Sequence, residues 1–382
     1  MQEHAAAPPR PRLVWPDLAK GVCILLVVLH HATTKHYVDI LPVALAPVGE
    51  AWAGLSHALK PIRMPLFFVI SGWFAANALH RPWARVARRA ASPYYLYVVW
   101  LVLLFGVFTV ERTLPLNRTQ DLGEFGLDLL WASTGLWFLF ALALYFVVSK
   151  LLVRYDARWV LAGAAAAALL TSALPVDEVN RLSVPFHFVY FVLGSRYAGL
   201  VRRIAAERRR WMLPALTVSF VALSVLLTVR PVPRSVDLFL LSVVGVPAAI
   251  LLAVVVSRSP RISGPLSRLG RQTLPVYVLH MPVLAVLAHL PAWLGPESGA
   301  WAVAVSVVYP VLLTGAIAAA CLVLHDGLVR VGGRYLFEMP RPRLAALRGQ
   351  RRPMATVPSR VTSSMISAFS PAAAISSRVD AD

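Results

Sequence analysis

The chain has 382 residues, of which 58% are hydrophobic and only 14% are charged, and its mean hydropathy is +0.67. Soluble domains carry about 25% charged residues, so this composition excludes an ordinary soluble domain and indicates a protein that crosses a membrane several times. The net charge is +19, but the basic residues stand in short segments between apolar runs. Membrane topology therefore explains the charge better than nucleic-acid binding, and we expect a lipid bilayer and no nucleic acid as partners.

Ten apolar runs are long enough to cross a bilayer as helices of about 20 residues. They cover residues 18–35, 62–79, 93–111, 135–152, 159–174, 184–200, 211–229, 236–256, 273–291 and 301–325. The predicted fold is all-α, a polytopic membrane protein with about ten transmembrane helices. We expect a cytoplasmic N-terminal segment (1–16), a membrane-embedded domain (17–338) and a basic cytoplasmic tail (339–382) that is disordered because it lacks apolar periodicity.

The distribution of basic residues between the apolar runs predicts the orientation of the chain. If the N-terminus is cytoplasmic, 29 of the 37 lysines and arginines fall on the cytoplasmic side. Cytoplasmic segments of membrane proteins carry an excess of Lys and Arg, so both termini are predicted to be cytoplasmic. A multi-pass protein of the cell membrane, in a bacterium, is the expected location.

The first apolar run contains an acid, a base and two histidines. At about 100° per residue, Lys20 and His31 lie within about 20° of each other on a helix, and Asp17 shares their face, whereas His30 is displaced by about 80°. Ionisable groups inside a membrane usually serve function. A neutral imidazole can accept a proton from a hydroxyl, and Asp17 and Lys20 are spaced to form an ion pair. The alternative is a lysine that fixes topology, followed by a structural histidine.

Four arginines precede the third run, at positions 81, 85, 88 and 89, with the spacing of one helical stripe. The planar guanidinium group binds phosphate through paired, charge-assisted hydrogen bonds, so a nucleotide-like donor on the cytoplasmic side is a natural ligand. The alternative is a cytoplasmic loop whose positive charge serves topology alone.

Further candidates for contact with a substrate or for structural hydrogen bonds lie inside the apolar runs, namely Ser71, Trp137, His187 and His280. Ser71 belongs to a Ser-Gly pair that allows helices to approach closely, and Trp137 fits an interfacial aromatic residue. An isolated intramembrane histidine is more often a structural hydrogen-bond donor than a catalyst. The sequence lacks the paired His and Glu spacing of zinc hydrolases, and we expect no metal.

Together these segments resemble the acyltransferase 3 family of integral membrane O-acyltransferases. The family has a basic residue, ten intervening residues and a catalytic histidine on its first helix, which Lys20 and His31 match and His30 does not. Its two arginines after the second helix, separated by two residues, correspond to Arg85 and Arg88. Further landmarks in family order are residues 64–72, 136–139 and 274–282. Residues 17–21 and the last of these landmarks look most like the fucose 4-O-acetylase-like branch, although lysine replaces the commoner arginine at position 20.

The resemblance implies an acyl-CoA donor, acetyl-CoA in the simplest case, on the cytoplasmic side and a carbohydrate hydroxyl as acceptor. It implies His31 as general base, Lys20 and Asp17 as its support on the same face, and Arg85 and Arg88 as anchors for the donor phosphates. The ester would then be formed across the bilayer. A transporter or flippase of lipid-linked sugars is the competing class, since it also has many helices and intramembrane polar residues.

Overall fold

The computed structural model describes residues 13–112, 119, 121–174, 176, 179–289 and 297–340. These residues form helices and connecting segments without a strand, which confirms the all-α class. Most of the predicted N-terminal segment (1–16) and nearly all of the predicted tail (339–382) lie outside the described residues.

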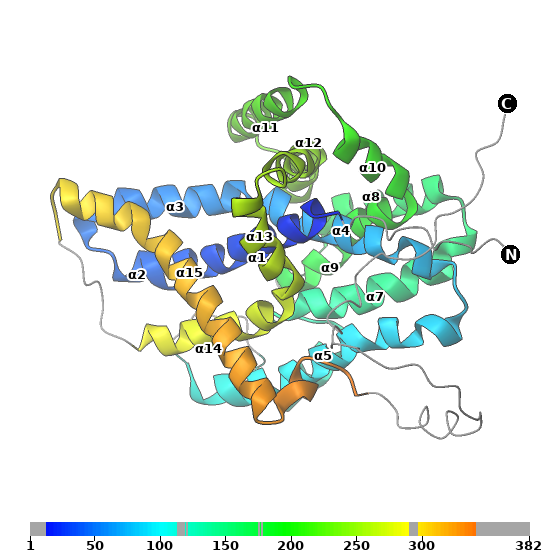
Figure 1. The fold of residues 1–382 in the computed structure, drawn as a ribbon, viewed down its shortest axis with the longest axis horizontal. Helices are drawn as coiled ribbons and strands as arrows, with labels where there is room; N and C mark the ends of the chain where they lie inside the picture. Colours follow the sequence, from blue (N-terminus) through cyan, green and yellow to red (C-terminus); the bar gives the residue numbers. More distant parts are fainter. Residues whose placement is uncertain are drawn as a thin grey trace, which may run out of the picture.

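Each of the ten predicted apolar runs contains a long helix, and shorter helices connect them (Figure 1). The long helices are α1 (Trp15–Ala32), α4 (Lys60–Leu79), α5 (Trp83–Val110), α7 (Trp137–Leu151), α8 (Ala157–Leu170), α9 (Val179–Arg196), α11 (Met212–Val229), α12 (Arg234–Val256), α14 (Thr273–Ala288) and α15 (Ala300–Arg330). The shorter helices are α2 (Val38–Ile40), α3 (Ala46–Ala58), α6 (Leu122–Leu130), α10 (Ala198–Ala206) and α13 (Pro260–Arg271).

Length and hydropathy identify seven candidate membrane spans in the described part of the chain. They are Trp15–Ile40, Val43–Leu79, Trp83–Val110, Trp137–Arg154, Met212–Val229, Arg234–Val256 and Ala300–Arg330. The apolar segments Ala157–Ala173 and Thr273–Ala288 are shorter, and α9 contains Asn180, Arg181 and His187, which lower its hydropathy. The chain is therefore a multi-pass membrane protein in which seven of the ten predicted runs meet both requirements for spanning.

The first helical segment is longer than predicted, because it continues beyond residue 35 through a π-helix, Thr33–Tyr37, to Ile40. The sequence becomes polar there, which is why the apolar run ends earlier. Tyr37 is fully buried, and its hydroxyl donates a hydrogen bond of 2.6 Å to the Ser306 carbonyl oxygen on α15. This bond between distant segments anchors the extension of the helix.

Two pairs of helices cross at glycines, where the main chains come into direct contact. Between α4 and α9, a Cβ atom at Gly72 would lie 2.2 Å from the Phe191 carbonyl oxygen, and one at Gly194 would lie 2.0 Å from that of Val69. Small residues at helix interfaces allow this approach in membranes, as the Ser-Gly pair at residues 71 and 72 predicted. The second crossing joins α1 and α13 through Gly21 and Gly270.

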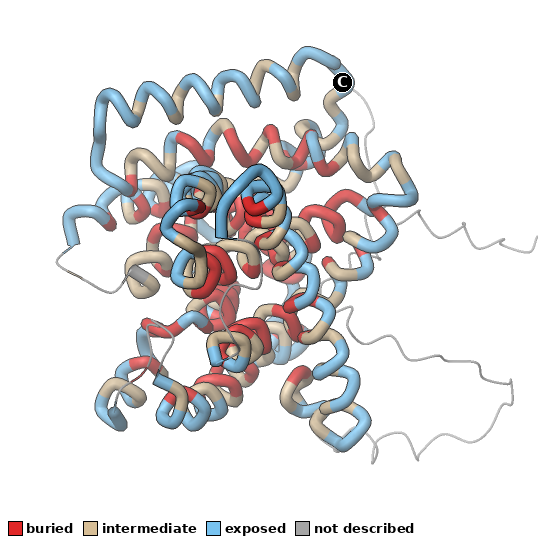
Figure 2. Tube along the Cα trace, turned by 90° about the vertical axis from the view of Figure 1, so that its left-hand side faces the viewer, coloured by how far each residue is buried: buried red, intermediate tan, exposed pale blue. Residues whose placement is uncertain are grey.

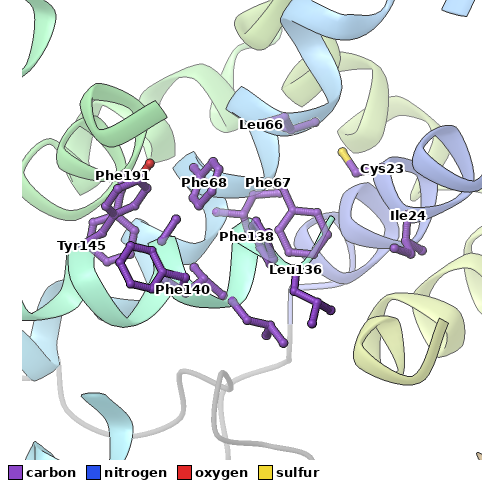
Figure 3. Close-up of a cluster of buried hydrophobic side chains, with 14 of the residues drawn as sticks. Cys23, Ile24, Leu66, Phe67, Phe68, Leu136, Phe138, Phe140, Tyr145 and Phe191 are labelled. Atoms are coloured by element: carbon purple, nitrogen blue, oxygen red, sulfur yellow. The ribbon is translucent and has the colours of Figure 1, made fainter. Parts of the chain in front are cut away.

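The interior of the bundle is a cluster of aromatic and aliphatic side chains (Figure 3). Phe68 on α4 is fully buried, and its ring lies 4.8 Å from that of Phe138 and 5.1 Å from that of Tyr145, both on α7. Buried residues gather in the middle of the bundle and exposed ones at its periphery (Figure 2), where α11 has no buried residue. Because exposed positions on α11 are apolar, this helix is suited to face lipid.

Candidate active site

Asp17 and Lys20 form an ion pair at the start of α1. The Lys20 Nζ lies 3.0 Å from Asp17 Oδ1, and both side chains are largely shielded from solvent, with 12% and 5% of their surfaces exposed. The same ammonium group lies 5.2 Å from the centre of the Phe74 ring on α4. The predicted acid and base are therefore brought together, and each largely neutralises the charge of the other.

His31 lies farther along α1, about 16 Å from Lys20 at 1.5 Å per residue, so the ion pair and the histidine are separate features of one helix. The His31 ring packs against His280 of α14, with ring centroids 5.3 Å apart and an angle of 35° between the rings. The Nδ1 of His31 is buried and has no hydrogen-bond partner among the described residues.

His280 has a defined tautomer in this arrangement. Its Nδ1 lies 2.8 Å from the Tyr277 carbonyl oxygen and 3.1 Å from that of Val276. A carbonyl oxygen only accepts hydrogen bonds, so Nδ1 carries the proton and Nε2 is left as an acceptor. That Nε2 is also buried without a partner among the described residues. Unsatisfied buried polar atoms are costly and rare in native proteins, so these two nitrogens mark a place for a ligand or a proton.

His30 points to a different set of neighbours. Its Nδ1 lies 2.8 Å from Ser56 Oγ on α3, and its ring lies 5.9 Å from that of His57. The Arg63 Nη1 donates to the Ser56 carbonyl oxygen (3.2 Å) and to its Oγ (3.4 Å). Arg63 is only 5% exposed, and no carboxylate of the described chain lies within ion-pair distance of it. A buried positive charge thus stands beside the two adjacent histidines.

His187 and Trp137 form a second aromatic pair, with ring centroids 5.1 Å apart, so Trp137 packs inside the bundle. The His187 Nδ1 lies 2.7 Å from the Ser183 carbonyl oxygen and carries the proton there. Tyr277 links this pair to His280, because its hydroxyl donates to the Gly135 carbonyl oxygen (2.6 Å) two residues before Trp137. Ser71 is not part of this group, since its hydroxyl donates to the Phe67 carbonyl oxygen (2.8 Å) in its own helix.

The arginines predicted to hold the donor lie in the first turns of α5, which begins at Trp83, and not in a loop. Arg85 and Arg88 are both exposed. The Arg88 guanidinium donates to the carbonyl oxygens of Met339 and Pro340, the second at 2.8 Å. Arg88 therefore binds the main chain that follows α15, whereas Arg85 is available at the surface.

Two further arginines lie near these features, Arg89 of the predicted basic stripe and Arg63, and neither was among the residues predicted for the site. The Arg89 Nη2 points inward and donates to the Phe74 carbonyl oxygen (2.7 Å), close to the ring above which Lys20 lies. Arg63 directly precedes Met64 at the start of the predicted apolar run 62–79. A basic residue at the start of such a run was the signal that would have found it.

No group of three or more His, Cys, Asp and Glu side chains in the described chain is arranged to hold a metal ion. The arrangement of the polar groups is instead suited to proton transfer. It consists of buried histidine nitrogens without partners, a buried arginine beside them, and exposed arginines at the end of the bundle where α5 begins.

The fold and the site thus define a multi-pass, all-helical membrane protein with titratable groups gathered in its interior. The sequence model of the acyltransferase 3 family, described as an acyltransferase domain, matches residues 13–325. The chain therefore belongs to this family. This result confirms the family expected from the sequence.

Two curated relatives match parts of the chain. The inner membrane protein YcfT of Escherichia coli (strain K12) is 27% identical over 230 residues, which cover 54% of this chain and 63% of that protein. The nodulation protein NolL of Sinorhizobium fredii (strain NBRC 101917 / NGR234) is 28% identical over 197 residues, half of each chain. The matches thus span less than two thirds of either relative. No solved structure matches the chain.

Proposed function

We propose that this protein is a membrane-bound O-acyltransferase that moves an acyl group, acetyl in the simplest case, from acyl-CoA to a hydroxyl of a carbohydrate or glycoconjugate. Family membership supports the acyl transfer. The observation that carries the proposal is the contact of His31 with His280, in which each ring has a buried nitrogen without a partner among the described residues. Residues 17–21 and 274–282 support assignment to the fucose 4-O-acetylase-like branch.

His31 is the proposed general base. It removes the proton of the acceptor hydroxyl while the hydroxyl oxygen attacks the thioester carbonyl carbon. A C–O bond forms, the C–S bond breaks with its electron pair leaving on sulfur, and His31 returns the proton to that sulfur, so that coenzyme A leaves as a thiol. An imidazole can both accept and release a proton, as these two transfers require.

His280 is the proposed positioning residue for His31. Its Nε2 can only accept a hydrogen bond, and its contact with His31 places an acceptor beside a ring whose Nδ1 is unsatisfied. If His31 carries its proton on Nδ1 and donates it to the Nε2 of His280, the Nε2 of His31 is left unprotonated and can act as the base. Catalytic hydrogen bonds often tighten only when substrate is bound, which is consistent with the absence of that bond here.

Arginines are proposed to act at both ends of the acyl-CoA donor, the thioester and the phosphates. Arg63 is the buried cation next to the histidines and is suited to stabilise the negative charge that develops on the thioester oxygen. Arg85 and Arg88 are proposed to bind the phosphates of coenzyme A at the cytoplasmic surface, and Asp17 and Lys20 to fix the helix between the two ends. Binding of the donor by Arg88 requires its release from the carbonyl oxygens of Met339 and Pro340.

We further propose ten spans with both termini in the cytoplasm, because this arrangement places 29 of the 37 basic residues inside. The catalytic unit is residues 17–338, and residues 339–382 form a cytoplasmic tail. The Escherichia coli relative YcfT is an inner membrane protein, which supports the plasma membrane of a bacterium as the location.

The deciding experiment compares His31→Ala with its neighbour His30→Ala. Membranes of a deletion strain that carry each variant receive radiolabelled acetyl-CoA, and alkali-labile label in glycans and glycolipids is counted. We expect His31→Ala to lose activity by at least about 100-fold, as removal of a general base does, and His30→Ala to retain most of it. Size-exclusion chromatography of both variants controls for folding. Full activity of a folded His31→Ala protein would exclude the proposed base.

A further inference from the structure

A cavity of about 470 Å³ lies at the end of the bundle that contains the start of α1, away from the histidines. Its walls come from α1, α4, α10 and the end of α12. Trp15, which lines it, is 16 residues before His31, a separation of about 24 Å along the helix. The cavity is therefore separate from the proposed catalytic centre, and neither Arg85 nor Arg88 contributes to it.

The walls of the cavity are mainly apolar. Trp15 and Trp73 stack on each other, with ring centroids 5.5 Å apart and an angle of 23° between the rings. Val254 and small apolar residues of α10 complete this surface, and among the described lining residues Ser257 is the one polar side chain besides the arginines. A surface of this kind accepts hydrocarbon and offers few hydrogen bonds to a sugar or a nucleotide base.

Three arginines, Arg202, Arg208 and Arg258, stand around the apolar walls. All three are exposed, and in the described part of the chain none forms an ion pair with a carboxylate. Arg202 belongs to α10, a short helix that buries Val201 toward the bundle and exposes its basic residues. Three unpaired guanidinium groups beside hydrocarbon-binding walls are complementary to a phosphate group that carries an acyl chain.

We propose that this cavity binds an anionic phospholipid of the cytoplasmic leaflet. The phosphate of the headgroup contacts the three arginines, and the upper part of an acyl chain lies against Trp15, Trp73 and Val254. Basic pockets between transmembrane helices on the cytoplasmic side are known to bind such headgroups. This inference uses the proposed orientation of the chain and is independent of the proposed acyl transfer.

Native mass spectrometry of the purified full-length chain tests the site, with phosphatidylglycerol and phosphatidylcholine as the two probes. We expect the wild-type protein to retain phosphatidylglycerol at a concentration at least about tenfold lower than phosphatidylcholine, since each arginine near a membrane surface favours anionic lipid. The triple variant Arg202→Ala, Arg208→Ala and Arg258→Ala should lose that preference. The matched control is Arg203→Ala, Arg209→Ala and Arg210→Ala, which removes three exposed arginines outside the cavity and should keep it.

Three results would overturn the proposal. These are equal retention of the two lipids by the wild-type protein, unchanged preference in the triple variant, and displacement of bound phosphatidylglycerol by acyl-CoA, which would assign the cavity to the donor. If the triple variant is not monodisperse, the single charge reversal Arg258→Glu takes its place. Because lipid retention is measured without acceptor or acyl transfer, a negative result here leaves the His31 experiment unaffected.

Discussion

Gly270 of α13 packs against the main chain of Asp17 on α1 so closely that a Cβ atom at Gly270 would lie 1.7 Å from the Asp17 carbonyl oxygen. The contact is reciprocal, since a Cβ atom at Gly21 would lie 2.1 Å from the Leu266 carbonyl oxygen. The crossing of α13 therefore holds the turn of α1 that carries the Asp17–Lys20 ion pair. The two helices meet through their main chains, so no side-chain rotation can make room for a methyl group.

The first prediction is that Gly270→Ala is strongly destabilising. Overpacking of an interior costs about 1–3 kcal/mol, and a clash with main-chain atoms belongs at the upper end of this range or above it. The measurement is the thermal midpoint and the monodisperse yield of the detergent-solubilised protein. Gly264→Ala is the control, because it lies in the same helix with no atom within 4 Å of the added Cβ. Equal stability of the two variants would refute a close crossing of α1 and α13.

The second prediction concerns Asp128 on α6, whose carboxylate is fully buried. Asp128 accepts hydrogen bonds from Thr119 Oγ1 (2.7 Å) and from Ser133 N (3.0 Å) and Oγ (2.6 Å), and its Oδ1 lies 3.7 Å from Arg181 Nη2. Asp128→Ala leaves these donors unsatisfied in a buried place. Breaking one partner of a buried charged network costs about 3–5 kcal/mol.

Asp121→Ala is the matched comparison for Asp128→Ala. Asp121 caps the N-terminus of α6 by accepting from Glu124 N at 2.8 Å, and it is exposed. Loss of such a cap costs about 1 kcal/mol. Thermal unfolding should therefore rank Asp128→Ala well below Asp121→Ala, and the reverse order would show that the Asp128 network contributes little to stability.

The helix register of the first span could be predicted from the sequence, because it depends only on periodicity within one helix. Asp17 and Lys20 pair as their spacing indicated. The contact of His31 with His280 could not be predicted in this way, since it joins residues 249 positions apart and depends on how α1 and α14 pack. The directions in which Arg88 and Arg89 point could not be predicted either, because adjacent residues of one helix face different surroundings. Arg88 points to the main chain after α15, and Arg89 points to the interior.

The count of spans shows a similar limit. A run of apolar residues is sufficient evidence for a span when the helix is long, as in α12 and α15. It is weaker for α9, whose polar residues face neighbouring helices: the Asn180 Nδ2 donates to the Ser133 carbonyl oxygen at 2.6 Å, and His187 packs on Trp137. Hydropathy treats these residues as unfavourable in the membrane, although tertiary contacts satisfy them.

The third prediction tests the donor anchors. If Arg85 and Arg88 bind the phosphates of coenzyme A, Arg85→Ala and Arg88→Ala should each raise the KM for acyl-CoA by at least about tenfold, the value expected for one charge-assisted hydrogen bond. Arg158→Ala is the control, because Arg158 is an exposed arginine of α8 that already pairs with Asp156 at 3.0 Å. A lower thermal midpoint with an unchanged KM for Arg88→Ala would show that Arg88 serves only to hold Met339 and Pro340.

The fourth prediction separates a positioning role of His280 from a structural one. His280→Ala removes the acceptor next to His31 and should lower kcat by about 10–100-fold with little change in the KM for acyl-CoA, because the base loses its orientation and the donor site is intact. His280→Gln restores an oxygen acceptor and should recover part of the kcat. A merely structural histidine would instead lower the thermal midpoint of both variants and leave the kcat of the folded fraction unchanged.

His187→Gln is the control for this comparison, since His187 is also buried and protonated on Nδ1 but packs on Trp137, away from His31. It should leave kcat close to the wild-type value. Equal losses of kcat in His187→Gln and His280→Ala would mean that activity responds to any change in the polar interior. A selective loss at His280, together with rescue by glutamine, would show that its acceptor nitrogen acts through His31, because both histidines are buried and protonated on Nδ1 but only His280 contacts His31.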